Sequence, residues 1–174
     1  MWARTGTPAP ASAATTRWAE PVGRIAHPTR ITVPTPFGPV TLVEGGGRLV
    51  GVDWRDDPGE SSPLLQEAAR QVCAYFDRRL TRFDLALDWG EGLNGDVRRA
   101  MAGIPMGETR TYGQIAKALG APAQAVGQAC GANPLPILIP CHRVTGTDWF
   151  GGFSAPGGVE TKAALLRHEG ALLL

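Results

Sequence analysis

The first half of the chain is interrupted by turn-forming residues at short intervals, which restricts it to short strands. From Arg30 to Trp54 the sequence reads RITVPTPFGPVTLVEGGGRLVGVDW. Three apolar, β-branched runs, at 31–33, 40–43 and 49–52, are separated by PFG and GGG. Gly and Pro favour tight reversals, and runs of this kind joined by short reversals are typical of antiparallel hairpins. The segment therefore predicts a small three-stranded antiparallel sheet.

A helix is predicted directly after this sheet. Apolar residues recur at helical spacing from Leu64 to Phe76, which indicates one buried helix face. Cys73 belongs to this apolar series, and a free cysteine packs as a small hydrophobic residue. We therefore expect Cys73 to lie in the core.

The second half has the pattern of short helices. Helical stretches are predicted near 97–104, 112–119, 122–133 and 158–170. Thr111 is a plausible N-cap and Gly120 a plausible C-terminal stop for the second of them. Together with the helix after it, this stretch forms a helix-turn-helix candidate that ends near Ala132. Residues 123–131 of the later helix are mainly Ala and Gly and include no Arg or Asn to read base edges. If this helix meets DNA, close and sequence-tolerant contact is expected.

These patterns predict an α+β fold with three segments. Residues 1–29 are rich in Ala, Thr and Pro and are expected to be a flexible arm. Residues 30–92 form the domain with the antiparallel sheet and its helix. Residues 93–174 form a mostly helical C-terminal domain that holds the helix-turn-helix and the PCHRV motif.

Charge and cysteine content exclude some classes of protein. The formal net charge of +1 does not indicate nucleic-acid binding, although residues 98–174 carry 7 basic against 4 acidic side chains. The 3 cysteines suit a reducing compartment, so a cytoplasmic location is expected. The chain has no CxxC spacing, which disfavours a zinc site. It also has no apolar run of about 18 residues, so no membrane partner is expected.

Cys141 is either a buried core cysteine or a nucleophile, and a Cys-His pair by itself favours the buried cysteine. It lies in NPLPILIPCHRVTG, directly before His142. A thiol with a pKa of about 8.5 supplies little thiolate at neutral pH and needs a base or a positive environment. Neighbouring side chains of an extended segment point to opposite sides, so a Cys141–His142 contact requires a turn or a water between them. Glu169, in RHEG, is a candidate to orient the histidine.

Several motifs occur together and in order around this cysteine. NPLPILIPCHRV is preceded by TYGQIAKALG and AVGQACGAN, and it is followed by GGFSAPGGVETKAALLRHEG. In this order they closely resemble the O6-alkylguanine-DNA alkyltransferases, also called methylated-DNA–protein-cysteine methyltransferases. The resemblance is strong over residues 104–170 and looser over 30–103, where it implies a ribonuclease-H-like α/β domain for 30–92.

The resemblance implies a repair reaction without a cofactor or metal, because the damaged base is itself the alkyl donor. The partner would be double-stranded DNA containing O6-alkylguanine, bound by a protein monomer. The alkyl group would pass irreversibly from O6 of a flipped guanine, with O4 of thymine as a second candidate, to Cys141. His142 would act as the base through water and Glu169 would hold it. Tyr112 would donate a proton toward the departing guanine, and Asn133 would brace the turn that carries the cysteine.

The same resemblance implies a set of DNA and base contacts. Val144 and Ser154 would recognise the base edge, and Lys162 would support the glycine-rich loop. The remaining expected contacts lie on the second helix of the helix-turn-helix and on the loop after the motif: Gln124, Ala125, Val126, Gly127, Cys130 and Phe153. Small-residue packing is a second reading for Cys130. Trp149 and Phe150 either line the pocket or pack beside it.

Gln124 departs from the family pattern. It stands where family members have an arginine that enters the duplex and fills the space of the flipped base. Glutamine lacks the charge and the planar donor fork of arginine. We therefore expect weaker DNA affinity or slower repair of duplex DNA, with the transfer chemistry retained.

Two other functions compete with repair. The first is a non-catalytic sensor like the alkyltransferase-like proteins, which bind damaged DNA but replace the cysteine that this chain keeps. The second is a Cys-His hydrolase, for which the sequence has no separate oxyanion or triad signature.

Overall fold

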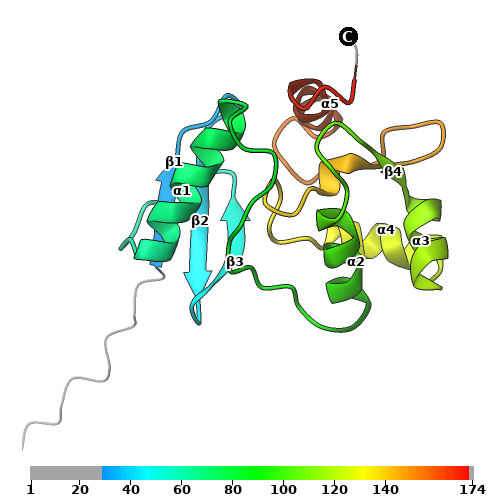
Figure 1. The fold of residues 1–174 in the computed structure, drawn as a ribbon, viewed down its shortest axis with the longest axis horizontal. Helices are drawn as coiled ribbons and strands as arrows, with labels where there is room; N and C mark the ends of the chain where they lie inside the picture. Colours follow the sequence, from blue (N-terminus) through cyan, green and yellow to red (C-terminus); the bar gives the residue numbers. More distant parts are fainter. Residues whose placement is uncertain (1–28, 173–174) are drawn as a thin grey trace, which may run out of the picture.

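The computed structural model describes residues 29–172 and begins with a three-stranded antiparallel sheet (Figure 1). Its strands, in spatial order, are β1 (Thr29–Val33), β2 (Val40–Gly45) and β3 (Arg48–Asp53). The β2–β3 reversal contains Gly46 and Gly47 at φ of 59° and 73°, a backbone region that glycine adopts without strain. The sheet predicted from the turn formers is confirmed.

Helix α1 (Pro63–Phe76) packs against β1 and β2. It begins at Ser62, whose hydroxyl accepts the Leu65 N–H at 3.1 Å. The prediction that Cys73 is a core residue is wrong, because this side chain is exposed. The buried face of α1 is centred on Val72 and Tyr75 instead. Cys73 follows Val72 by one residue, about 100° around the helix, and so faces solvent.

The second part of the fold is mainly helical (Figure 1). Helices α3 and α4 are joined by a three-residue turn and pack against each other, and both contact α2. A two-stranded parallel pairing of β4 with β5, which the sequence patterns do not predict, links the start of α3 to the chain just after Cys141. The elements are α2 (Gly92–Ala102), β4 (Arg110–Thr111), α3 (Tyr112–Leu119), α4 (Ala123–Gly131), the 3₁₀ turn η1 (Cys141–Arg143), β5 (Val144–Thr145) and α5 (Val159–His168).

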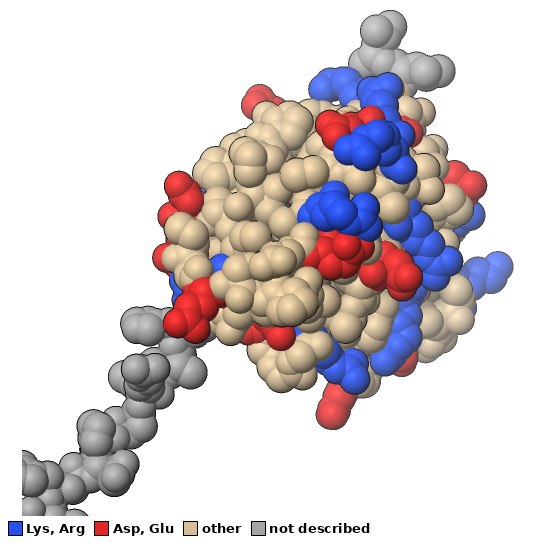
Figure 2. Space-filling model, turned by 60° about the vertical axis from the view of Figure 1, so that its left-hand side comes forward, with Lys and Arg blue, Asp and Glu red and all other residues tan. Residues whose placement is uncertain are grey.

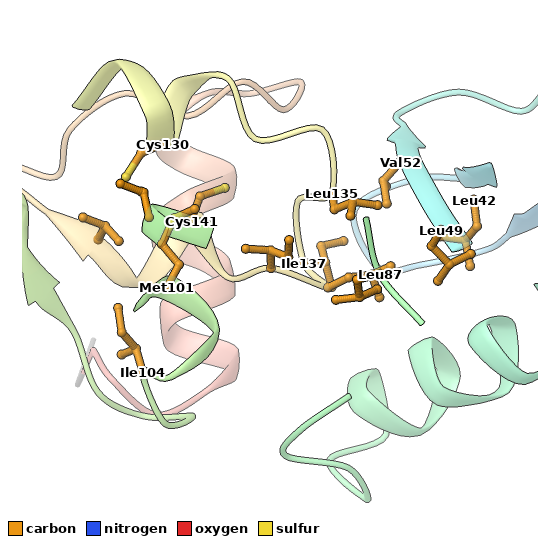
Figure 3. Packing of buried hydrophobic residues seen from close by; sticks show 14 of the residues in the cluster. Leu42, Leu49, Val52, Leu87, Met101, Ile104, Cys130, Leu135, Ile137 and Cys141 are labelled. Carbon is orange, nitrogen blue, oxygen red and sulfur yellow. The ribbon is translucent and has the colours of Figure 1, made fainter. Parts of the chain in front are cut away.

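One cluster of buried apolar side chains runs through both parts of the molecule. Figure 3 shows Leu135 and Ile137 between the side chains of the sheet and those around Cys141. The Val52 N–H also donates to the Pro134 carbonyl at 2.8 Å, which ties β3 to the segment that leads to Cys141. The sheet and the helical part therefore share one core.

The predicted N-terminal arm lies outside the described residues apart from Thr29, the first residue of β1. Among residues 29–172, no helix is long and apolar enough to cross a membrane.

Candidate active site

The segment between α4 and η1 is held by side-chain and backbone hydrogen bonds. The Asn133 side-chain amide donates to the Ile139 carbonyl at 2.9 Å and accepts the Leu135 N–H at 3.2 Å. Within this segment, Ile137 is buried and has a φ of 73°. That conformation costs a β-branched residue about 1–3 kcal/mol, so the surrounding contacts must hold it in place. Asn133 thus closes the turn that presents Cys141.

Cys141 lies at the start of η1 and is 8% exposed. Burial raises the pKa of its thiol, and the Asn133 side chain and the nearby Lys162 ammonium oppose that shift. The raised pKa keeps the thiol protonated at neutral pH. Cys141 therefore needs a base before it can act as a nucleophile.

His142 is fully buried beside Cys141 and contacts Glu169. Its Nε2 lies 2.8 Å from Glu169 Oε1. Burial lowers the pKa of His142, although the carboxylate raises it in part, so the ring is neutral at neutral pH. A neutral ring with Nε2–H toward the carboxylate leaves the Nδ1 lone pair free, and Nδ1 has no hydrogen-bond partner within residues 29–172. The ring can therefore accept a proton at Nδ1.

Glu169 has more partners than the sequence predicts. Arg143 donates to Oε2 through Nε and to Oε1 through its Nη2, each at 2.8 Å. Tyr75 donates its hydroxyl to Oε1 at 2.7 Å. Burial alone would raise the pKa of Glu169, but the bonds from His142 and Arg143 outweigh burial and lower it to about 2.

Two partners of Glu169, Arg143 and Tyr75, are not predicted from the sequence. Arg143 is adjacent to His142 in the PCHRV motif, and that position was a usable signal. Tyr75 lies 94 residues before Glu169 in a helix with an ordinary amphipathic pattern, so nothing in its local sequence connects it to the site.

A cavity of about 770 Å³ opens above Cys141 between α3, α4 and the loop after β5. Tyr112, at the first position of α3, forms one wall, and burial raises the pKa of its phenol, so the hydroxyl remains a donor. The cavity is lined by Tyr112, Ala123, Gln124, Gly127, Gln128, Cys130, Gly131, Cys141, Trp149, Gly152, Phe153 and Ser154. Its volume and largely apolar wall suit a flat organic ring such as a nucleobase.

Lys162 lies behind this cavity. It is buried in α5, donates to the Val144 carbonyl and lies 6.0 Å from the centre of the Tyr112 ring. Burial lowers the pKa of Lys162 to about 8, and the two nearby cysteines oppose that shift. Its ammonium group is a positive charge close to Cys141 that favours the thiolate.

Charge is mixed over the surface that can be followed in Figure 2, where basic and acidic side chains lie next to one another. Within residues 29–172, no group of three or more His, Cys, Asp or Glu side chains could hold a metal ion.

Comparison with known proteins gives a consistent result. Methylated-DNA–protein-cysteine methyltransferase of Mycobacterium tuberculosis is 41% identical, with 79% of this chain and 90% of that protein covered. The chain belongs to this methyltransferase family. The protein of the same name from Methanosarcina barkeri is 38% identical over 79% of this chain and 94% of its own length.

Two further comparisons agree with membership of the methyltransferase family. Residues 93–171 match the family model described as 6-O-methylguanine DNA methyltransferase, DNA binding domain. The crystal structure of Mycobacterium tuberculosis OGT in complex with DNA superposes with a TM-score of 0.70 at 39% identity, covering 81% of this chain and 92% of that one. The α+β fold is therefore confirmed.

Seven of the predicted methyltransferase site residues lie together in the cavity lining. These are Tyr112, Gln124, Gly127, Cys130, Cys141, Phe153 and Ser154. Four more lie behind Cys141: Asn133, His142, Lys162 and Glu169. Val126 and Val144 are fully buried, and Ala125 is half-buried outside the cavity lining. Trp149 lines the mouth and is 65% exposed, whereas Phe150 is outside the lining.

Proposed function

We propose that this protein repairs DNA by transferring an alkyl group from O6 of guanine irreversibly to Cys141, with O4 of thymine as a second candidate donor. It acts as a cytoplasmic monomer on double-stranded DNA. The names of its relatives and the DNA-bound neighbour support action on methylated DNA. The observation that carries the proposal is Cys141 beneath a cavity with room for a nucleobase, beside a buried His142–Glu169 pair at 2.8 Å.

The proton of Cys141 passes to Nδ1 of His142 through a water. The imidazolium formed is stabilised by Glu169, whose low pKa keeps it ionised. The thiolate sulfur then attacks the alkyl carbon, a carbon–sulfur bond forms, and the bond from that carbon to O6 breaks. Its electron pair stays with the guanine, to which Tyr112 donates a proton, and the proton held by His142 passes through solvent to restore the Tyr112 phenol. The product thioether has no leaving group, so each molecule reacts once.

The target base must leave the duplex before this reaction. Cys141 is 8% exposed and lies below the rim formed by α3 and α4. A base that remains stacked in the DNA duplex cannot reach this cysteine. Extrusion of the nucleotide solves this problem in enzymes that act on bases. Helices α3 and α4 are the proposed DNA-binding helix-turn-helix. Gln124 is exposed on α4 at the cavity edge, where it can enter the space left by the base.

Intact-mass measurement tests the proposal directly. The protein is incubated with a short duplex that carries one O6-methylguanine, with an unmodified duplex as the control. We expect a gain of one methyl per protein molecule, located on Cys141 by peptide mapping and absent from Cys141→Ala. A matched Cys130→Ala variant should still gain the methyl, since Cys130 also lines the cavity but it is Cys141 that directly precedes His142.

The other outcomes identify the competing functions. Selective binding of the modified duplex with no mass gain would indicate a damage sensor. Repeated turnover of an ester substrate would indicate a hydrolase. Either result would contradict the transfer proposal.

A further inference from the structure

Glu169 receives one hydrogen bond from the part of the molecule that contains the sheet and α1. His142, Arg143 and Glu169 belong to η1 and to the end of α5, but Tyr75 lies in the last turn of α1, beside the sheet. Its hydroxyl reaches Oε1 at 2.7 Å, the same oxygen that faces His142 Nε2. Tyr75 is 1% exposed and the Glu169 side chain is fully buried. The bond is therefore shielded from water and strong enough to orient the carboxylate.

Tyr75 itself is held firmly. Its ring packs against Phe83 and His168, with ring centres 5.4 and 5.3 Å apart. The His168 ring also contacts the Tyr75 carbonyl through Nε2 at 3.1 Å, so the end of α5 meets α1 at two adjacent points. Burial raises the pKa of the Tyr75 phenol well above its ordinary value. The hydroxyl is thus a permanent donor over the pH range in which proteins are active.

We infer that Tyr75 is a positioning residue for the transfer reaction, through which α1 sets the orientation and basicity of Glu169 and thereby of His142. This inference rests on the proposed function. A carboxylate that shares its charge among several donors attracts the imidazolium proton less strongly than one with fewer donors. Tyr75 therefore both fixes Oε1 toward His142 and limits how far Glu169 raises the basicity of the ring.

The surroundings of His142 define what else can change its titration. Within residues 29–172, the charged or titratable groups that act on His142 are Glu169, Cys141 and Arg143 of η1, and Lys162 of α5, while His168 packs on the Tyr75 ring at 5.3 Å. Tyr75 reaches the ring only through Glu169. Removing its hydroxyl leaves the other groups in place, so a shift in the titration of His142 can be assigned to Glu169.

The test is Tyr75→Phe, which keeps the ring and removes one oxygen. The single-turnover rate of methyl transfer to Cys141 is measured against pH for the wild type and the variant. A base must be neutral to act, so the rate rises with pH through the apparent pKa of His142. We expect this rising limb of the pH–rate profile to move to higher pH in the variant. At pH values below the apparent pKa, the transfer rate should fall several-fold. The matched control is Phe83→Leu, which weakens packing on the same ring without touching Glu169 and should lower stability while the limb stays in place.

A second measurement does not depend on the chemistry. In a Cys141→Ser background, NMR titration of the His142 ring should show a higher pKa with Tyr75→Phe than without it. If the wild type transfers the methyl group but neither the limb nor the His142 titration moves, the inference is overturned and the proposed function stands. If the wild type transfers no methyl group to Cys141, the proposed function fails and this inference fails with it.

Discussion

At the scale of single residues, the site depends on a few buried polar groups that are almost fully paired. Glu169 accepts bonds from three residues, and each donor is itself buried. A buried ion pair contributes little net stability when intact, yet loss of one partner is costly because the other charge is left unpaired. Residues of this site should therefore affect stability and chemistry together.

Replacing Glu169 with Gln tests this dependence through pH. The folded pKa of about 2 lies below the unfolded value of about 4.3, so the carboxylate contributes stability above pH of about 4.3 that is lost as pH falls toward 2. Glu169→Gln should lower the unfolding free energy at pH 7 by about 3 kcal/mol, because it leaves Arg143 unpaired. Urea unfolding at several pH values checks this. The difference in unfolding free energy between the variant and the wild type should narrow below pH of about 4. A difference that stays constant with pH would show that the Glu169 charge does not cause the loss of stability.

Substitution of Gln124 tests the proposed role of this residue in opening the DNA duplex. Gln124 is exposed at the cavity edge, so Gln124→Arg adds a cation at the proposed DNA-binding surface. We expect tighter binding of duplex DNA and faster transfer from it, each by several-fold, because a phosphate-facing cation also releases counterions. Filter binding and single-turnover transfer measure the two effects. Transfer from a free O6-alkylguanine base should not change, and an unchanged duplex rate would remove the proposed role of Gln124.

At the scale of elements, the caps of α3 set the position of Tyr112. Thr111 accepts the Gln114 N–H at 3.1 Å, and the Gln114 side chain accepts the Thr111 N–H at 2.8 Å. Gly120 ends the helix with a φ of 63°. This reciprocal capping begins the helix at Tyr112, which places the phenol at the cavity wall.

Thr111→Ala removes this cap. The unfolding free energy should fall by about 1 kcal/mol, since one N–H at the start of α3 loses its acceptor. Thermal unfolding followed by circular dichroism is the measurement. The control is Thr109→Ala, two residues earlier and outside the capping box, which should change stability by less than about 0.5 kcal/mol. Equal losses in both variants would argue against the capping explanation.

At the scale of the whole molecule, the sheet braces the active site rather than standing apart from it. Val52 bonds Pro134, Trp54 meets Phe153 edge-on at 6.4 Å, and Tyr75 bonds Glu169. Leu135, fully buried, lies between the two parts in Figure 3. These contacts predict that the sheet and the site unfold together.

Leu135→Ala tests this coupling. Truncation of a fully buried leucine should cost about 2–5 kcal/mol, and the wild type and the variant should each unfold in a single transition. Urea unfolding is followed by two probes, far-UV circular dichroism and tryptophan fluorescence. The half-buried Leu64 of α1 is the control, and its alanine variant should cost less. Separate transitions by the two probes would instead support independent folding of residues 30–92 and 93–174.

The sequence by itself determined the meander and the bounds of α3, because turns and caps depend on neighbouring residues, and its PCHRV motif made Cys141 the candidate nucleophile. Tertiary structure alone decided that Tyr75 joins Glu169, that Cys73 faces solvent, and that β4 pairs with β5. The apolar periodicity of α1 placed Cys73 on the buried face, but packing against the rest of the molecule buried Tyr75 instead. Contacts between residues far apart in the chain depend on how the elements pack, and no local pattern records that.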